Sequence, residues 1–349
     1  MSAAVERIAL AEGYDVARLI NGCWQLSAGH GRRPRDRRAA VDALLQRADA
    51  GFTTFDCADI YGGVEELLGE VLAANRRRGG PPLQVHTKCV PDRSVLPHLD
   101  RAYVRRVVDR SLVRLGIERL DLVQFHWWDY AVPGLVEAAG WLEELRREGK
   151  IRLLGATNFD LPHLRQLVDA GIPIRTHQVQ YSLLDRRPAG AMADYCRARG
   201  IHLLAYGTLA GGFLGPRYHR APPPAEPLAN RSLVKYRLII DEVGGWRRLQ
   251  QLLDLLLEVA RRHRTSPATV ATRWVLDRPA VAAAIVGSPD ARHLDDHRRV
   301  FAVALEPEDR RRLDALLAEM GSPAGEVYAL EREPGGRHAS IMKTELNRA

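Results

Sequence analysis

Four polar residues whose side chains could transfer protons lie at or just past the ends of short apolar runs: Asp56, Tyr61, Lys88 and His126. Asp56 and Tyr61 fall in the segment GFTTFDCADIY, Lys88 ends the run LQVHTK, and His126 ends the run LDLVQFH. Runs of this length and composition are typical of β-strands. A carboxylate, a phenol, an ammonium and an imidazole that meet at one place form a proton-transfer site. We therefore take these four residues as the candidate catalytic residues.

Eight such strand-like runs alternate along the chain with amphipathic stretches at helical spacing. The runs cover residues 18–22, 53–56, 83–87, 121–126, 151–155, 174–179, 201–206 and 281–286. Strands and helices that alternate in this way form right-handed βαβ units, and eight units favour closure into a (β/α)8 TIM barrel of the α/β class. An open doubly wound sheet would need a GxGxxG turn after an early strand, and the sequence has none there. A barrel would bring the four polar residues to one mouth.

The 349 residues favour a single barrel domain over positions 1–320, with its last helix at 307–320. Two regions depart from the alternation. Residues 216–246, after the seventh strand, form a long polar, Pro-rich segment that reads as a loop, and such loops in barrels often serve as lids or belts. The tail over 321–349 mixes Gly and Pro with charged residues, so it either covers the barrel mouth or extends into solvent.

The composition argues against several classes of function. The net charge is +8, but 47 of the 51 basic residues are arginines, and they are interleaved with acidic residues rather than with aromatic ones. This pattern predicts a solvated surface and no nucleic-acid partner. The four cysteines have neither zinc-ligand nor disulfide spacing, and Cys23, Cys57 and Cys89 are expected to be buried. Without a signal peptide or a membrane-spanning run, we expect a cytoplasmic protein with no membrane partner.

Six segments, in order and at compatible spacings, resemble the aldo-keto reductase superfamily over about positions 15–320. The segment over 51–61 followed by EELLG at 65–69 looks like the first signature of that family, and Thr87-Lys88 and DLVQFHW at 121–127 match its catalytic segments. The segments that match its cofactor contacts are GATNF at 155–159, QVQYS at 178–182 and AYGTLAG at 205–211.

The resemblance implies hydride transfer between a nicotinamide cofactor and a small carbonyl compound or sugar. Tyr61 would donate the proton, and Lys88 would lower the pKa of its phenol. Asp56 would hold Lys88 in place, and His126 would orient the substrate oxygen.

The resemblance also assigns binding residues. Asn158 and Gln178 would bind the carboxamide, Tyr206 would stack on the nicotinamide, and Trp24 would flank the nicotinamide or the substrate. Aromatic residues after the fourth strand, Trp127 and Trp128, would either contact the substrate or fill the loop against its neighbour. The full set of expected cofactor residues is Trp24, Asp56, Thr157, Asn158, Gln178, Tyr206, Gly207, Thr208, Leu209, Ala210, Gly211, Gly287, Ser288, Arg292 and His297.

The choice of cofactor is less determined, because the family usually has a cation where this chain has Pro289 and Asp290. Arg292 is the candidate for a 2′-phosphate contact, and Asp290 would oppose it. His297 takes the place of an Asn that meets the adenine. NADP(H) is the expected cofactor and NAD(H) the alternative.

Three functional readings stay open. The protein could reduce an aldehyde or ketone, or it could run the reaction in reverse on an alcohol or a sugar hemiacetal. It could instead be a cofactor-binding regulatory subunit with little turnover, as the potassium-channel beta subunits of this superfamily are. The sequence leaves the physiological substrate and the oligomeric state open.

Overall fold

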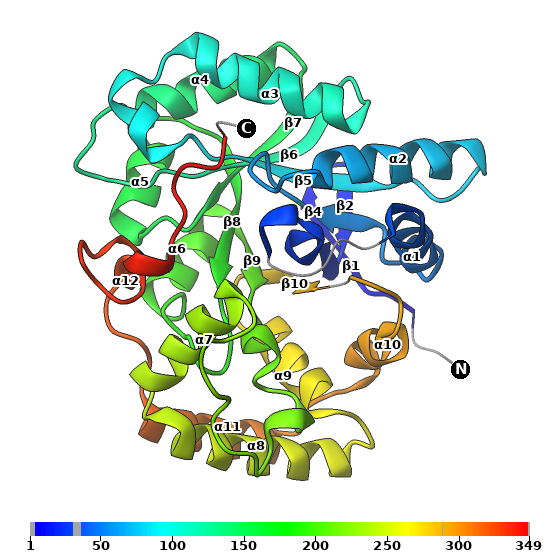
Figure 1. The fold of residues 1–349 in the computed structure, drawn as a ribbon, viewed down its shortest axis with the longest axis vertical. Helices are drawn as coiled ribbons and strands as arrows, with labels where there is room; N and C mark the ends of the chain where they lie inside the picture. The colour runs from blue at the N-terminus through cyan, green and yellow to red at the C-terminus, as the bar shows by residue number, and fades with distance from the viewer. Residues whose placement is uncertain (1–3, 31–35, 288, 348–349) are drawn as a thin grey trace.

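The computed structural model describes residues 4–30, 36–287 and 289–347. Eight parallel strands close into a barrel in the order β10-β3-β4-β5-β6-β7-β8-β9, with helices around it (Figure 1). The predicted (β/α)8 barrel is therefore confirmed. The strands are β3 Leu19–Gly22, β4 Thr54–Asp56, β5 Gln84–Cys89, β6 Leu120–Phe125, β7 Ile151–Thr157, β8 Ile174–Gln180, β9 His202–Tyr206 and β10 Val281–Gly287.

The strands form because short runs of apolar and β-branched residues are buried on both faces, as parallel barrels require. β10, with the sequence VAAAIVG, is buried from Val281 to Val286. The backbone of β10 also pairs with that of β3, where Ala284 lies opposite Leu19, and this pairing closes the barrel. All eight predicted strands are present, each within a few residues of its expected bounds.

Ten of the described helices follow the barrel alternation or its end: α1 Arg37–Asp49, α2 Val64–Arg77, α3 Arg101–Leu115, α4 Leu135–Arg147, α5 Leu161–Asp169, α6 Ala191–Arg199, α8 Gly245–Arg262, α9 Pro267–Leu276, α10 Leu294–Ala302 and α11 Pro307–Met320. Their ends follow local chemistry. Asp100 and Asp160 cap α3 and α5 by accepting backbone N–H bonds, and Gly116 ends α3 in the left-handed conformation. The apolar stripe of α8 buries Leu249, Leu252 and Leu256.

An N-terminal hairpin precedes the barrel and was not expected from the sequence. It consists of β1 Arg7–Ala11 and β2 Tyr14–Ala17, paired antiparallel. Leu10, Tyr14 and Val16 of the hairpin belong to one apolar cluster with inward-facing barrel residues such as Leu122 and Leu204. The hairpin therefore packs on the interior of the barrel.

The segment 216–246 is not the irregular loop that its composition predicted. It contains a short turn, η5 Pro216–Tyr218, and a helix, α7 Arg231–Glu242. Asn230 caps this helix by accepting the N–H of Leu233 at 3.0 Å. Leu238, Ile239 and Ile240 are buried, and α7 packs on α8 and on the segment after β9. This tertiary packing stabilises a helix that the nearby prolines made hard to predict from the sequence.

The tail contains a short helix, α12 Ala329–Arg332, and the turn η6 Ala339–Ile341. Figure 1 shows it in red, running from α12 to its last described residues near α3. The N–H of Arg93 donates to the carbonyl of Thr344 at 2.9 Å. Asp92 accepts the N–H groups of Leu346 and Asn347, each at 2.8 Å. The tail is thus bonded to the loop that follows β5.

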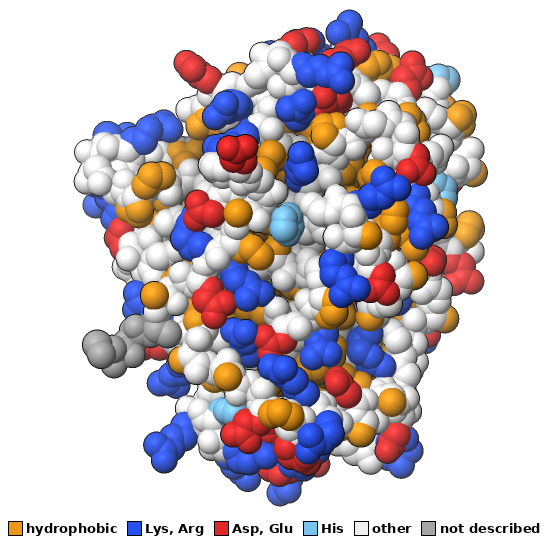
Figure 2. Space-filling view, turned by 180° about the vertical axis from the view of Figure 1, so that it is seen from behind, with side chains coloured by type: hydrophobic (Ala, Val, Ile, Leu, Met, Phe, Trp, Pro, Cys, Tyr) orange, Lys and Arg blue, Asp and Glu red, His pale blue; other side chains and the backbone are white. Residues whose placement is uncertain are grey.

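The surface mixes charges of both signs. On the face in Figure 2, lysine and arginine side chains alternate with aspartate and glutamate. Many of them form ion pairs, such as Arg312 with Glu258 at 2.5 Å and Arg78 with Asp49 at 2.6 Å. Within the described ranges, no helix has the length and apolar character needed to cross a membrane.

Candidate active site

A cavity of about 700 Å³ opens at the carboxyl ends of the barrel strands. Parallel register brings the strand-end residues together there, since Lys88 on β5 lies beside Gln124 on β6. The predicted residues that line it are Trp24, Asp56, Tyr61, Lys88, His126, Trp128, Thr157, Asn158, Gln178, Tyr206, Gly207, Thr208, Leu209, Gly211, Gly287, Arg292 and His297. Residues that are far apart in the sequence therefore share one cavity.

Lys88 and Asp56 form a buried ion pair at the base of this cavity. The Lys88 ammonium donates to Oδ2 of Asp56 at 2.8 Å and to the carbonyl of Cys57 at 2.7 Å. Asp56 also accepts from the amides of Gln178, at 2.6 Å, and Gln124, at 3.1 Å. Burial disfavours the Lys88 charge, but the Asp56 carboxylate outweighs burial and holds the pKa of Lys88 above its ordinary value. The lysine is therefore a fixed cation.

Tyr61 lies next to this pair. Its ring centroid is 5.2 Å from the Lys88 ammonium and 4.8 Å from the Trp24 ring. Burial raises the pKa of the Tyr61 phenol, and the Lys88 charge opposes burial without reversing it. The net direction is opposite to the lowering expected from the sequence, because a nearby cation was visible there and the extent of burial was not. The phenol is therefore protonated, as a proton donor must be.

His126 is 3% exposed and held in one orientation. Its Nδ1 lies 3.0 Å from the carbonyl of Thr157, which can only accept, so Nδ1 carries the hydrogen. Burial and the nearby Arg332 charge lower the pKa of His126 to about 3. The imidazole is therefore neutral. Its Nε2, which is buried and has no hydrogen-bond partner among the described residues, is left as an acceptor.

The expected nicotinamide residues contact one another. The Tyr206 hydroxyl donates to Oδ1 of Asn158 at 2.9 Å, and the Lys235 ammonium donates to that hydroxyl at 3.3 Å. The Gln178 amide, which donates to Asp56, also donates to Gln124 at 3.0 Å. Thr157 donates its hydroxyl to the Gln178 carbonyl at 3.2 Å. The amides and the Asp56 carboxylate thus form one continuous network.

The glycine-rich segment after β9 packs under α7. A Cβ on Gly207 would lie 2.5 Å from the Tyr236 hydroxyl, and one on Gly211 would lie 2.7 Å from the Tyr236 ring. Both glycines have φ near +70° (73° and 66°). Ala210, which was expected to contact the cofactor, is fully buried and is not among the residues that line the cavity.

The three tryptophans differ. Trp24 and Trp128 line the cavity, and the Trp24 indole N–H donates to the Ser232 hydroxyl of α7 at 3.1 Å. Trp127 is fully buried, and its indole N–H donates to the carbonyls of Asp129, at 2.9 Å, and Val132, at 3.2 Å. Its expected contact with substrate is therefore not supported by its placement. Trp127, which follows β6, packs inside the loop after that strand.

At the far end of the cavity, His297 accepts a hydrogen bond at Nδ1 from Arg47 at 2.9 Å. Burial and the Arg47 charge lower the pKa of His297 to about 3, so it is neutral with its hydrogen on Nε2. Arg292, with a side chain 75% exposed, pairs with Asp290 at 2.8 Å. A Cβ on Gly287 would lie 2.7 Å from the Gln25 amide, and Ser288 lies outside the described residues.

Several residues around the cavity were missed by the sequence reasoning. They come from α1, α7 and the tail: Arg47, Ser232, Tyr236, Tyr328, Glu331 and Arg332. None of them lies at a strand end, and no local motif marks them. The Asn230 cap and the apolar run LII within 238–240 were the available signals for α7.

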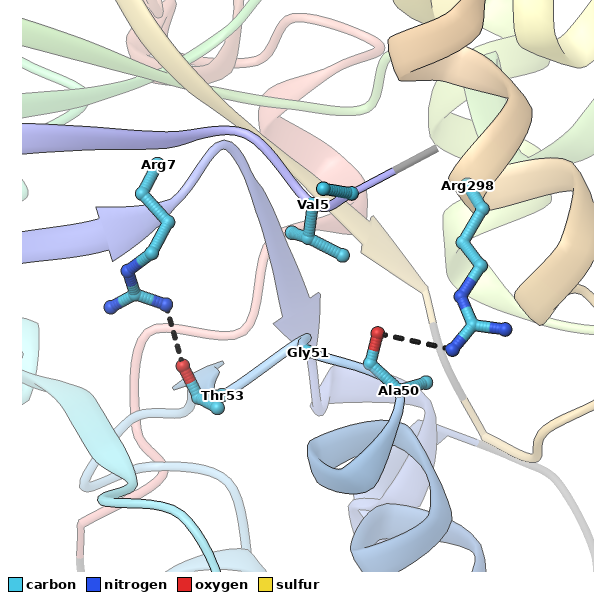
Figure 3. A pocket seen from close by; sticks show the side chains of 7 residues that line it. Val5, Arg7, Ala50, Gly51, Thr53 and Arg298 are labelled. Atoms are coloured by element: carbon cyan, nitrogen blue, oxygen red, sulfur yellow. Dashed lines mark hydrogen bonds between the residues drawn. The ribbon is translucent and has the colours of Figure 1, made fainter. Parts of the chain in front are cut away.

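A second pocket, of about 430 Å³, lies near the N-terminal hairpin (Figure 3). Arg7 donates to the Thr53 hydroxyl at 2.9 Å, and Arg298 donates to the Ala50 carbonyl at 3.4 Å. Its other lining residues are Ala4, Val5 and Gly51. Two guanidinium groups and a hydroxyl do not form an acid–base set, so we place the candidate site in the larger cavity.

The fold and the site together define a barrel enzyme equipped for proton transfer. The model of the aldo/keto reductase family matches residues 18–318, and the chain belongs to this family. Membership makes the protein an NAD(P)H-dependent oxidoreductase.

Three similar proteins illustrate the breadth of the relatives. Flagellar radial spoke protein 5 of Chlamydomonas reinhardtii is 29% identical over 297 residues, which cover 68% of this chain and 56% of that protein. The NADH-specific methylglyoxal reductase of Escherichia coli K12 is 27% identical over 84% of this chain and 92% of its own. An aldo-keto reductase from Klebsiella pneumoniae, solved in complex with NADPH, shares the fold at a TM-score of 0.68 and 23% identity, over 92% of this chain and 97% of that one.

Proposed function

We propose that the protein transfers hydride between a nicotinamide cofactor and the carbonyl carbon of a small aldehyde or ketone, with Tyr61 as the general acid and base. The same residues serve the reverse reaction on an alcohol or a sugar hemiacetal. NADP(H) is the proposed cofactor and NAD(H) the alternative; one relative is named as NADH-specific and one similar structure contains NADPH.

One observation carries this proposal: the 2.8 Å Lys88–Asp56 ion pair lies in the same cavity as Tyr61 and His126. A buried cation beside a phenol has a specific use, since it stabilises the phenolate that remains after the phenol gives up its proton. A purely structural ion pair would not need a tyrosine and a neutral histidine around it.

The cavity residues fit a nicotinamide cofactor. Asn158 and Gln178 supply amides for its carboxamide, the Tyr206 ring supplies a stacking face, and the glycines at 207 and 211 allow close backbone approach. The buried Nε2 of His126 has no partner in the part of the chain that the structure describes, and this also points to a bound molecule. When bound, the cofactor supplies or accepts the hydride.

The protein's own residues handle the proton. In reduction, Tyr61 donates its proton to the substrate oxygen as negative charge develops there. Lys88, kept charged by Asp56, stabilises the resulting phenolate. His126 accepts a hydrogen bond at Nε2 from the hydroxyl that forms, and so orients it. In oxidation, the phenolate takes the proton back.

The test has two measurements. Quenching of protein fluorescence by NADPH and NADH measures cofactor binding, and absorbance at 340 nm follows turnover with a panel of aldehydes, ketones and aldoses. Cofactor binding with turnover on at least one substrate class supports the proposal. Binding without turnover across the panel would favour the regulatory-subunit reading, and absence of binding would contradict both.

A further inference from the structure

Arg332, at the end of α12 in the C-terminal tail, reaches into the loops that form the cavity wall. Its guanidinium donates to three backbone carbonyls: Trp127 at 2.7 Å, Trp128 at 3.2 Å and Asn158 at 2.8 Å. It also lies 4.2 Å from the centroid of the Tyr130 ring. The rigid fork of a guanidinium suits this role, because one side chain bonds two separate loops at once.

The two loops held in this way carry proposed binding residues. Trp128 follows β6 and packs edge-on against His126, with ring centroids 4.4 Å apart. Asn158 follows β7 and has φ of 61°, a left-handed conformation that costs energy for a residue other than glycine. Its N–H donates to the Gln178 carbonyl at 2.9 Å, and its carbonyl accepts from Arg332. Arg332 therefore completes the support of a strained backbone.

The neighbouring residue anchors the tail. The Glu331 side chain is fully buried and pairs with Arg187 at 3.2 Å and with Lys235 of α7 at 3.4 Å. Burial alone would raise the pKa of Glu331, but Lys235 and Arg187 lower it to about 2, so the carboxylate stays charged. Arg187 is itself held by Asp185 at 2.7 Å. The buried ion pairs of the preceding residue, Glu331, thus fix the position of Arg332.

We propose that Arg332 is a positioning residue of the active site: it holds the backbones of Asn158 and Trp128 in the arrangement that binds the cofactor amide and the substrate. The tail, through this residue, is then a required part of the site. This inference rests on the proposed function, because it assigns Asn158 to the cofactor and Trp128 to the substrate.

Two variants separate the geometry of Arg332 from its charge. Arg332→Lys keeps the charge but cannot span three carbonyls, and Arg332→Met keeps much of the length without the charge. We expect both to raise the Kd for NADPH and the KM for the carbonyl substrate by about tenfold. The matched control is Arg337→Met in the same tail, with a side chain 69% exposed and paired to Asp241 at 3.6 Å, and it should leave both constants unchanged.

A second measurement, the pKa of His126, reports on the charge of residue 332 alone. In a ¹⁵N NMR titration, the pKa of His126 should rise in Arg332→Met, since a neighbouring cation is lost, and should stay at its wild-type value in Arg332→Lys. A merely structural defect would not separate the two variants in this way. Thermal melting checks that each variant folds. If Arg332→Met does not fold, the Kd and KM of Arg332→Lys decide the outcome.

The outcomes distinguish this inference from the proposed function. Wild-type Kd and KM in both Arg332 variants would overturn the positioning role while leaving the reductase proposal intact. A wild-type protein that binds neither NADPH nor NADH would overturn the proposed function itself. Raised Kd and KM in both variants, together with an unchanged control, support the inference.

Discussion

At the scale of single residues, the phenol of Tyr61 combines two opposing influences. Burial makes phenolate unfavourable and raises its pKa, while the Lys88 ammonium, 5.2 Å from the ring, favours phenolate. A group balanced in this way holds its proton until negative charge develops beside it and then releases it to a neighbour. In the proposed mechanism, the Lys88–Asp56 pair therefore acts through Tyr61 and has no need to touch the substrate.

Replacing Tyr61 by phenylalanine tests this role. Tyr61→Phe should abolish turnover while leaving the Kd for NADPH within about tenfold of wild type, since the hydroxyl acts mainly in the transition state. Steady-state kinetics at 340 nm and a fluorescence titration measure the two effects. Tyr195→Phe, on α6 and not among the residues that line the cavity, serves as the control. Near-normal turnover in Tyr61→Phe would rule out the acid–base role.

The pair Arg292–Asp290 bears on the choice between NADPH and NADH. The Asp290 carboxylate engages Arg292 at 2.8 Å, so it competes with any phosphate for the same guanidinium. Arg292→Ala should weaken NADPH much more than NADH. Asp290→Asn should shift the ratio of the two Kd values toward NADPH. Equal changes for both cofactors would exclude a 2′-phosphate contact at Arg292.

At the scale of elements, α7 and the tail cover parts of the site that the barrel strands leave open. α7 contributes Ser232, bonded to Trp24 at 3.1 Å, and Tyr236, packed on the glycine-rich segment after β9. It is joined to the tail by the ion pair of Lys235 with Glu331. α7 and the tail are thus linked to each other, and together they cover the site.

The packing of α7 makes Gly207→Ala a sharp test. Any alanine at φ of +73° costs about 1–2 kcal/mol, and here its Cβ would also lie 2.5 Å from the Tyr236 hydroxyl. Gly171→Ala is the matched control, because φ is +83° and nothing lies within 4 Å of the new Cβ. Urea denaturation should show that Gly207→Ala loses about 1–3 kcal/mol more than the control. Adding Tyr236→Phe should recover part of this difference. An equal loss of stability in the two alanine variants would show that α7 moves away from the new Cβ at no cost in free energy.

At the scale of the whole molecule, histidines whose pKa is lowered by burial set the response to acid. Burial lowers the pKa of His86 to about 4 and the pKa values of His126, His177 and His297 to about 3. In the unfolded chain each has a pKa of about 6.5. Between these values the unfolded state binds protons that the folded state excludes. Asp59 opposes them, since burial raises its pKa to about 7 and the folded state keeps that proton.

The sign of the resulting pH dependence follows from proton linkage. The free energy of unfolding should fall as the pH drops from about 6.5 to about 4, because folding lowers the pKa of five histidines, the four above and His202, and raises the pKa of two carboxyl groups, Asp59 and Asp121, which act against them. Urea denaturation at pH 7, 6 and 5 measures the slope, and His177→Asn should reduce it. A free energy that stays constant from pH 7 to pH 5 would contradict this account.

The sequence by itself determined the barrel and the strand-end positions of Asp56, Tyr61, Lys88 and His126. Each strand is a short run whose apolar residues and boundaries are local features, and parallel strands that alternate with helices have few ways to pack. β10, for example, begins where the run VAAAIV begins, at Val281. The local pattern was sufficient because the apolar residues that favour strand formation are the same residues that become buried in the barrel.

The tertiary structure alone decided the rest. The helix within 216–246, the N-terminal hairpin and the hold of Arg332 on Asn158 each depend on contacts between segments far apart in the chain. The inward turn of Trp127 and the raised pKa of Tyr61 depend on burial, which is the sum of contacts from many elements. A local pattern carries no information about which distant segment will cover a residue, and that cover determines the chemistry of this site.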